Sequence, residues 1–142
     1  MKYGVARARH YAGPYERVGD EPIRWSDDPK VSCADAFVWR EDGMYQMIFN
    51  DLSGHVTGED HAGGPAHWMD GVSWQLAPAA KAYSRNVKWD DGSVVKPGTF
   101  ERPRLLIQKG RPTHLICATE DGPGGFARGS KTWSTVIPLR KD

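Results

Sequence analysis

The feature that most constrains the fold is a series of short β-type segments joined by turn sequences in the middle of the chain. Asp42-Gly43 and Asp70-Gly71 are turn dipeptides typical of tight hairpins, and each lies between two segments with strand-type composition. The four segments are residues 36–39, 44–49, 66–69 and 72–76. Four consecutive strands with tight turns predict one antiparallel sheet, either a propeller blade or one sheet of a sandwich.

The rest of the chain continues this pattern. Further strands are predicted at residues 3–8, 15–18, 82–88, 99–107, 111–116 and 132–139, and loops at residues 20–29 and 50–65. Pro138 predicts that the last strand lies at a sheet edge. No segment has helical periodicity over three turns, and the 142 residues include six Trp, five Tyr, 16 Gly and 10 Pro. We therefore expect one all-β domain over residues 1–142.

Charge and hydropathy argue against two classes of partner. Lys and Arg number 19 against 18 acidic residues, and no basic run stands out, so the chain lacks the positive surface that nucleic-acid binding requires. The first residues lack the apolar core of a signal peptide and no segment has membrane-spanning length, so we expect no membrane partner and a cytoplasmic location. Cys33 and Cys117 fit no metal or disulfide pattern and are interpreted as buried free thiols.

One carboxylate stands at the entrance of an apolar strand. Glu101 lies between Phe100 and Arg102, and Arg104 follows Pro103 just before a run of apolar residues. A carboxylate there fits an acid, a base or an acceptor for a sugar hydroxyl. The alternative interpretation is that Glu101 only forms an ion pair with Arg102 or Arg104 at a solvated strand end.

Several segments, in order along the chain, resemble the five-bladed β-propeller glycoside hydrolases, the group that contains families 43, 32 and 62. The segments that carry the resemblance are residues 4–8 with 13–18, 34–39 with 43–49, 67–74, 100–106 and 112–115. In that group three carboxylates from successive blades converge at one axial end of the propeller. The resemblance implies the same fold and a carbohydrate ligand for this chain.

The resemblance also implies roles for individual residues. Asp35 lies where the family has an Asp-Pro pair, so it corresponds to the orienting, transition-state-stabilising carboxylate, although Ala36 replaces the proline. Glu101 corresponds to the proton donor, whose pKa its surroundings would have to raise. The carboxylate of the early blade has no match, because its position would lie upstream of Met1. Arg102 is expected beside the same ligand.

Aromatic and histidine residues extend this expected sugar site. Trp39 and Trp68 offer rings on which a sugar could stack, although tryptophans at strand positions are usually packing residues. His67 and His114 are further candidates for ligand contact, and His114 also fits an ordinary sheet residue.

A metal interpretation of the histidines is weaker. His55, His61 and His67 fall near Asp51, Glu59 and Asp60, but their spacing matches no zinc motif. We therefore interpret this segment as the rim of a cleft with one histidine at the ligand, and we expect no metal and no cofactor.

The number of predicted strands limits how complete the expected propeller is. The predicted strands make about two and a half four-stranded blades, and a whole five-bladed propeller, with blades of roughly 40 to 50 residues, needs about twice the length of this chain. An open fragment exposes sheet edges and apolar flanks, which soluble proteins avoid. We therefore expect a partial β-propeller completed by a homodimer or higher homo-oligomer, or else a chain that is one part of a longer protein.

The sequence leaves three functions open. The first is a glycoside-hydrolase-like protein that binds a carbohydrate at Asp35 and Glu101, with hydrolysis undecided because one carboxylate is missing. The second is a non-catalytic carbohydrate-binding or assembly module on the same scaffold. The third is a structural β domain with no small-molecule ligand.

Overall fold

The computed structural model of the chain describes residues 3–68, 73–79, 81–122 and 128–139. All regular structure in these ranges is β-strand, which confirms the predicted all-β class. The strands are β1 (Tyr3–Arg7), β2 (Glu16–Ile23), β3 (Cys33–Glu41), β4 (Met44–Asp51), β5 (Ala62–Trp68), β6 (Trp74–Leu76), β7 (Val87–Lys88), β8 (Val94–Val95), β9 (Thr99–Gln108), β10 (Arg111–Glu120) and β11 (Thr132–Pro138). None of the described residues lies in a helix long and apolar enough to cross a membrane.

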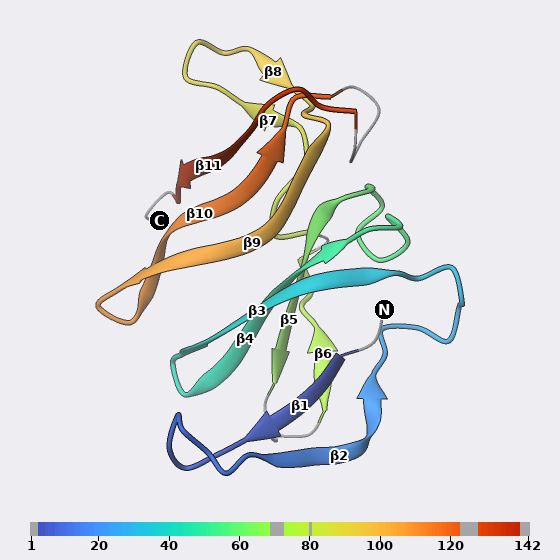
Figure 1. Ribbon diagram of the computed structural model, residues 1–142, viewed down its shortest axis with the longest axis vertical. Coiled ribbons are helices and arrows are strands. Elements are labelled where there is room, and N and C mark those ends of the chain that lie inside the picture. The colour runs from blue at the N-terminus through green and yellow to red at the C-terminus, as the bar shows by residue number, and fades with distance from the viewer. Residues whose placement is uncertain (1–2, 69–72, 80, 123–127, 140–142) are drawn as a thin grey trace.

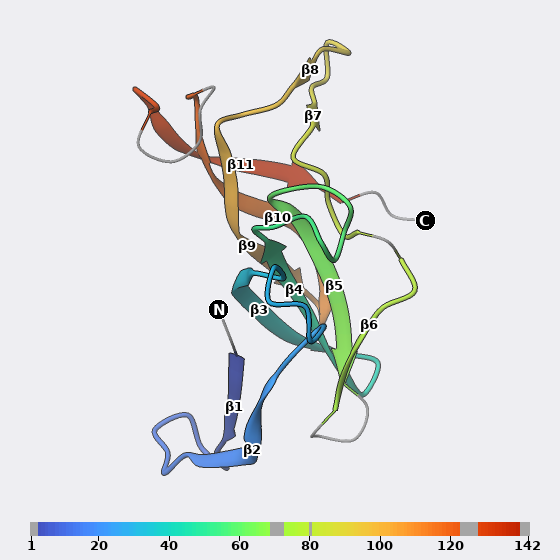
Figure 2. The same ribbon diagram turned by 90° about the vertical axis from the view of Figure 1, so that its right-hand side faces the viewer.

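Three antiparallel sheets follow one another in chain order (Figures 1 and 2). The hairpin β1–β2 lies on one side of the central sheet β3-β4-β5-β6, and the sheet β11-β10-β9 lies on the other side. A short hairpin, β7–β8, extends beyond the third sheet. The central sheet contains the four strands predicted from the hairpin pattern, in the predicted order.

Two hydrophobic cores hold this stack together, one on each face of the central sheet. Ile48 of β4 packs with Tyr83, Phe100 and Leu115 between the central and third sheets. Phe49, the next residue of β4, packs in the second core with Met47 and Ala66 on the side of the β1–β2 hairpin. Successive residues of a strand point to opposite faces, so apolar residues at both 48 and 49 allow β4 to be buried on both sides.

The glycine-rich segment before Pro65 belongs to a strand rather than to the predicted loop. β5 begins at Ala62, and Gly63 and Gly64 lie within it. A Cβ atom on Gly63 would lie 2.2 Å from the Tyr83 ring, and one on Gly64 would lie 2.2 Å from the Phe49 ring. Large aromatic rings therefore occupy the space of two missing side chains, and composition alone made this strand look like a loop.

Other boundaries also differ from the sequence prediction. β2 extends to Ile23 and takes in the start of the predicted loop, including Pro22, which an edge strand tolerates. The predicted strand at residues 82–88 is wrong over most of its length, because only a bridge from Tyr83 to Gly63 and the short β7 have strand pairing. β11 lies at the edge of its sheet, as Pro138 predicted, whereas the Asp70-Gly71 turn lies outside the described residues.

Candidate functional site

The first strands of the central and third sheets carry the same irregularity near their starts. In β3, Asp35 and Ala36 lie opposite the single residue Phe49 of β4. In β9, Arg102 and Pro103 lie opposite Cys117 of β10 in the same way. Each is a β-bulge, in which one extra residue bends the strand and redirects a side chain.

Both bulges contain a residue with an unusual backbone conformation. Asp35 has a φ of 57° and Arg102 has a φ of 54°. Residues other than glycine rarely adopt positive φ values, and such strain tends to persist at functional sites. Because the bulges correspond, Glu101 occupies in β9 the position that Ala34 occupies in β3, one residue before the strained one.

The two predicted carboxylates, Asp35 and Glu101, both act electrostatically on Tyr83. The Tyr83 ring lies against Gly63 and makes an edge contact with Phe100, with 5.5 Å between ring centroids. Burial raises the pKa of the Tyr83 phenol, and Cys117, Asp35 and Glu101 raise it further by their negative charge. Both carboxylates therefore lie within electrostatic reach of one buried hydroxyl.

Asn50 adds a buried amide to this end of the strands. It is fully buried, and neither its side-chain oxygen nor its side-chain nitrogen has a hydrogen-bond partner among the described residues. Asn50 pairs directly with Gly63, against which Tyr83 lies, and directly paired residues share one face of a sheet. The amide and the phenol therefore project on the same side.

His61, rather than a neighbouring arginine, is the partner of Glu101. The Nδ1 atom of His61 lies 3.4 Å from Oε1 of Glu101, and the two side chains are 27% and 16% exposed. His61 has a φ of 59°, and its backbone N–H donates to the Asp51 carbonyl at 2.7 Å. The backbone thus holds the imidazole against Glu101.

The structure contradicts the interpretation that Glu101 pairs with Arg102 or Arg104. Arg104 donates to the Pro103 carbonyl, and its guanidinium carbon lies 5.7 Å from the centre of the Phe37 ring. Arg102 is exposed and forms no ion pair or side-chain hydrogen bond with any described residue. The bulge redirects the Arg102 side chain from the direction that strand alternation predicts. The local sequence does not reveal the bulge.

The segment that presents His61 is fixed by two acceptor groups, the buried Asp51 and the half-buried Glu59. The Asp51 carboxylate accepts hydrogen bonds from the backbone N–H groups of Gly54, Val56 and Thr57. Burial raises the pKa of Glu59, but hydrogen bonds from Lys81, Ser84 and the Arg85 backbone outweigh it and leave that pKa below its ordinary value. These contacts make the segment a hydrogen-bonded support for His61.

The three histidines of the metal interpretation do not converge. His55 is exposed and its Nδ1 lies 3.1 Å from the Ser53 carbonyl, whereas His67 lies within β5. Within residues 3–68, 73–79, 81–122 and 128–139, no group of three or more His, Cys, Asp or Glu side chains is arranged to hold a metal ion.

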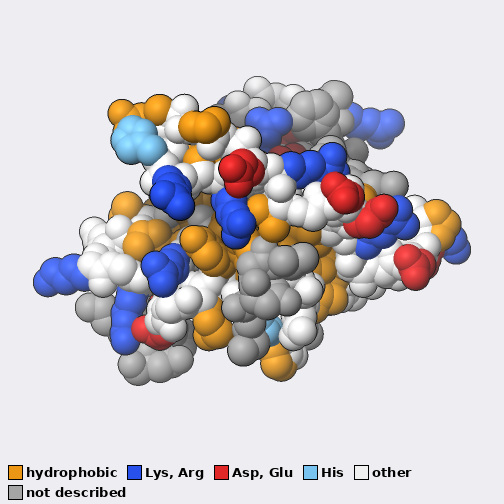
Figure 3. All heavy atoms as spheres, turned by 90° about the horizontal axis from the view of Figure 1, so that it is seen from below, with side chains coloured by type: hydrophobic (Ala, Val, Ile, Leu, Met, Phe, Trp, Pro, Cys, Tyr) orange, Lys and Arg blue, Asp and Glu red, His pale blue; other side chains and the backbone are white. Residues whose placement is uncertain are grey.

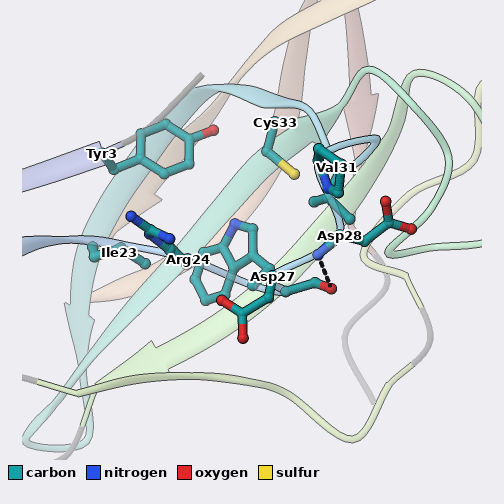
Figure 4. A pocket seen from close by; sticks show the side chains of 10 residues that line it. Tyr3, Ile23, Arg24, Asp27, Asp28, Val31 and Cys33 are labelled. Carbon is teal, nitrogen blue, oxygen red and sulfur yellow. Dashed lines mark hydrogen bonds between the residues drawn. The ribbon is translucent and has the colours of Figure 1, made fainter.

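A cavity of about 380 Å³ lies on the side of the first hairpin (Figure 4). Tyr3, Trp25 and Cys33 line it, and Arg24 and Asp27 stand at its border. Trp25 stacks on Phe49 with 4.8 Å between ring centroids. The Tyr3 hydroxyl and the Trp25 indole N–H are buried without a described hydrogen-bond partner.

Electrostatics connect this first cavity to Asp35. Burial raises the pKa of the Tyr3 phenol, and the neighbouring Cys33, Asp35 and Asp51 raise it further. The Tyr3 hydroxyl therefore lies within electrostatic reach of the Asp35 carboxylate, and it remains a hydrogen-bond donor at neutral pH.

A second cavity, of about 390 Å³, opens beside Glu101. Glu101 and Arg102 line it together with Trp133, which is 41% exposed. The remaining lining residues are Thr99, Ala118, Thr119, Glu120, Thr132 and Ser134. This second cavity therefore combines two carboxylates, a guanidinium and several hydroxyl groups.

The other predicted ligand-binding residues lie toward the opposite ends of their strands. Trp39 is four residues beyond Asp35 in β3, about 13 Å along an extended strand, and its indole N–H donates to Glu41. Trp68 ends β5 and packs against Tyr45 and Trp74.

His67 and His114 occupy the same far region of the sheets. His67 precedes Trp68 in β5, and His114 is paired with Leu106 near the β9–β10 turn. The structure thus places Asp35, Glu101 and Arg102 near the starts of β3 and β9, whereas Trp39, His67, Trp68 and His114 lie toward the opposite ends of their strands.

Four residues of this region were not singled out from the sequence: Asn50, Tyr83, Tyr3 and Trp25. The sequence offered one signal for these residues, namely that Asn50 directly follows the apolar run 47–49, because an amide is rarely buried without a hydrogen-bond partner. No family model, curated protein or solved structure matches the chain. Function is therefore argued from the residues gathered around Asp35 and Glu101, which we call the carboxylate end.

Proposed function

We propose that the chain binds a carbohydrate at the carboxylate end, the region formed by Asp35, Asn50, His61, Tyr83 and Glu101. The observation that carries this proposal is the cavity of about 390 Å³ that Glu101 and Arg102 line, together with the buried Asn50 amide, which has no described partner and lies on the face against which Tyr83 packs. Each sugar hydroxyl is both a donor and an acceptor of hydrogen bonds. A group of carboxylate, amide, imidazole and phenol side chains matches that chemistry.

The cavity beside Glu101 supplies further polar groups that a sugar needs. Arg102, Thr99 and Ser134 line it together with Glu101. Such donors and acceptors would select the orientation of a bound sugar. Trp39 and Trp68, to which the sequence had assigned a stacking role, lie toward the opposite ends of their strands.

The scaffold that we propose is part of a β-propeller, as the family resemblance implies. Three consecutive sheets stack in chain order, and the first strands of two of them present matched bulges. Leu106 and Val136 are 41% and 55% exposed on the third sheet. Viewed from below, from the side of the first hairpin, hydrophobic side chains also reach the surface between Lys and Arg side chains (Figure 3). Association with a second copy would cover such apolar flanks.

Binding is better supported than hydrolysis by this chain alone. Glycoside hydrolysis by two carboxylates needs one acid and one base or nucleophile, and Asp35 corresponds to an orienting group in the resembling family. Asp51 and Asp60 are already engaged, with the 53–57 segment and with Arg85 respectively. Glu101 would act as a proton donor only where another copy or another segment supplies the missing carboxylate.

The proposal is tested by calorimetric titration with a panel of methyl glycosides, followed by turnover assays on aryl glycosides. We expect at least one sugar to bind and Glu101→Gln to weaken its binding about tenfold, whereas the exposed control Glu21→Gln in β2 leaves it unchanged. Turnover that disappears in Glu101→Gln would establish an enzyme, and binding without turnover would establish a binding module. Failure of every sugar to bind would contradict the proposed function.

A further inference from the structure

Arg102 is an uncommitted cation in the second cavity. Its side chain is exposed and forms no ion pair or side-chain hydrogen bond with a described residue. Building on the proposed function, we propose that the carboxylate end takes an acidic saccharide, a sugar whose ring carries a carboxylate group that pairs with Arg102. This proposal specifies the class of ligand and assigns Arg102 the role of selecting it.

The acidic groups of the second cavity lie against groups other than Arg102. His61 Nδ1 lies 3.4 Å from Oε1 of Glu101 without forming a hydrogen bond, and the Glu120 carboxylate accepts a hydrogen bond from the Gly129 backbone N–H. Arg102 shares the cavity with both glutamates but is paired with neither. Its guanidinium therefore keeps its hydrogen-bond donors available for a ligand.

The backbone holds Arg102 in a fixed place. The residue has a φ of 54° inside a β-bulge, and the next residue, the buried Pro103, has a restricted backbone. A positive φ is uncommon for arginine, so the conformation is maintained by the surrounding strand pairing. The corresponding position in β3 carries the opposite charge, Asp35.

The chemistry of the guanidinium selects a planar anion. Five N–H donors in a rigid fork match the two oxygens of a carboxylate, and a neutral hydroxymethyl group offers only one oxygen. Thr99 and Ser134 line the same cavity and bring hydroxyl groups within reach of a sugar. A uronic acid is the simplest sugar that combines a pyranose face, hydroxyl groups and a ring carboxylate.

The test compares pairs of methyl glycosides that differ only at C6, such as methyl glucuronide with methyl glucoside and methyl galacturonide with methyl galactoside. For the best-bound pair, titration calorimetry at low ionic strength is expected to give at least tenfold tighter binding of the uronide. This preference is expected to shrink in 0.5 M sodium chloride, because it is electrostatic and that salt concentration shortens the screening length to roughly a few ångströms.

Variants of Arg102 separate the inference from the proposed function. Arg102→Gln is expected to abolish the preference for the uronide, Arg102→Lys to keep part of it, and the exposed control Arg111→Gln in β10 to keep all of it. Equal binding of neutral and acidic sugars, or a preference that survives in a folded Arg102→Gln protein, would overturn the inference and leave the proposed function standing. Failure of both members of every pair to bind would overturn both.

Discussion

The side-chain environment of Glu101 is determined by residues that are distant from it in the sequence. Its sequence neighbours Arg102 and Arg104 were obvious partners, yet its side chain lies against His61. A local pattern identifies the carboxylate, because charge at a strand entrance is visible in the sequence. It does not identify the partner, because the bulge in β9 and the positive φ of His61 depend on pairing between separate strands.

Asn50 provides the sharpest prediction for a single residue. Asn50→Ala removes a buried amide that has no described partner. The substitution loses packing contacts, but it also removes the unfavourable burial of unpaired polar atoms, which costs about 1–3 kcal/mol, so the two effects offset each other. We expect the free energy of unfolding to change by less than about 1 kcal/mol. Sugar affinity is expected to fall about tenfold in calorimetric titration.

The neighbouring residue Phe49 is the control for this prediction. Phe49→Ala removes a fully buried ring from the second core and is expected to cost about 3–5 kcal/mol in urea unfolding. A loss of stability in Asn50→Ala as large as that of Phe49→Ala would mean that Asn50 is a structural residue rather than a ligand contact.

The two thiols predict a dependence of stability on alkaline pH. Burial raises the pKa of Cys33 to about 12, with a contribution from Asp51, and burial alone raises the pKa of Cys117 to about 12. The ordinary thiol pKa is 9.0, so between pH 9 and pH 12 the unfolded chain has released protons that the folded chain retains. The thiol contribution to stability is therefore complete below pH 9 and is lost as the pH rises.

Urea unfolding at pH 7.5, 9 and 10 measures this effect. We expect the free energy of unfolding to decrease over that series, and to decrease less in a Cys33→Ala, Cys117→Ala double variant. An identical decrease in the double variant would show that other groups carry the alkaline dependence, among them Tyr3 and Tyr83, whose pKa values burial also raises.

At the scale of elements, β5 shows where composition misleads. A run containing Gly63 and Gly64 reads as a loop, since glycine weakens isolated strands. Because Gly63 and Gly64 have no side chains, the rings of Tyr83 and Phe49 fit against them. Tyr83 is distant from β5 in sequence, and Phe49 lies across the sheet on β4. The hairpin β3–β4, in contrast, was readable because its turn signal and its alternating strands are local.

Gly63→Ala tests the close contact between β5 and Tyr83. The new methyl group would lie 2.2 Å from ring atoms, so the ring must move, and we expect a loss of stability of about 1–3 kcal/mol together with weaker sugar binding. Gly4→Ala in β1 is the matched control, because nothing lies within 4 Å of the added methyl group. Its stability is expected to stay within about 0.5 kcal/mol. Equal effects of the two substitutions would contradict this packing.

At the scale of the whole molecule, the sequence predicted the all-β class and the membership of the central sheet. It did not predict that Trp25 covers one face of that sheet and Phe100 covers the other. The packing of one sheet on another depends on contacts between residues that are distant in the sequence. The matched bulges were equally hidden, since register irregularities arise only when strands pair.

The exposed apolar flank of the third sheet predicts self-association. Val136 is 55% exposed on β11, and a second copy that covers it would bury apolar surface. We expect sedimentation velocity to detect dimers or larger species at micromolar concentration, and Val136→Glu to shift the distribution toward monomer. Val94→Glu, at a 62% exposed position in β8, is the control and should leave the distribution unchanged. A monomer at every concentration would contradict this prediction.

The most direct test of sugar binding at the carboxylate end is a nuclear magnetic resonance titration of the ¹⁵N-labelled chain with the best-bound glycoside. We predict that the backbone amide signals of Asp35, His61 and Glu101 shift in proportion to bound sugar, while those of Trp68 and His114 stay in place. Shifts confined to Trp68 and His114, or no shifts with any glycoside, would contradict a carbohydrate site formed by Asp35 and Glu101.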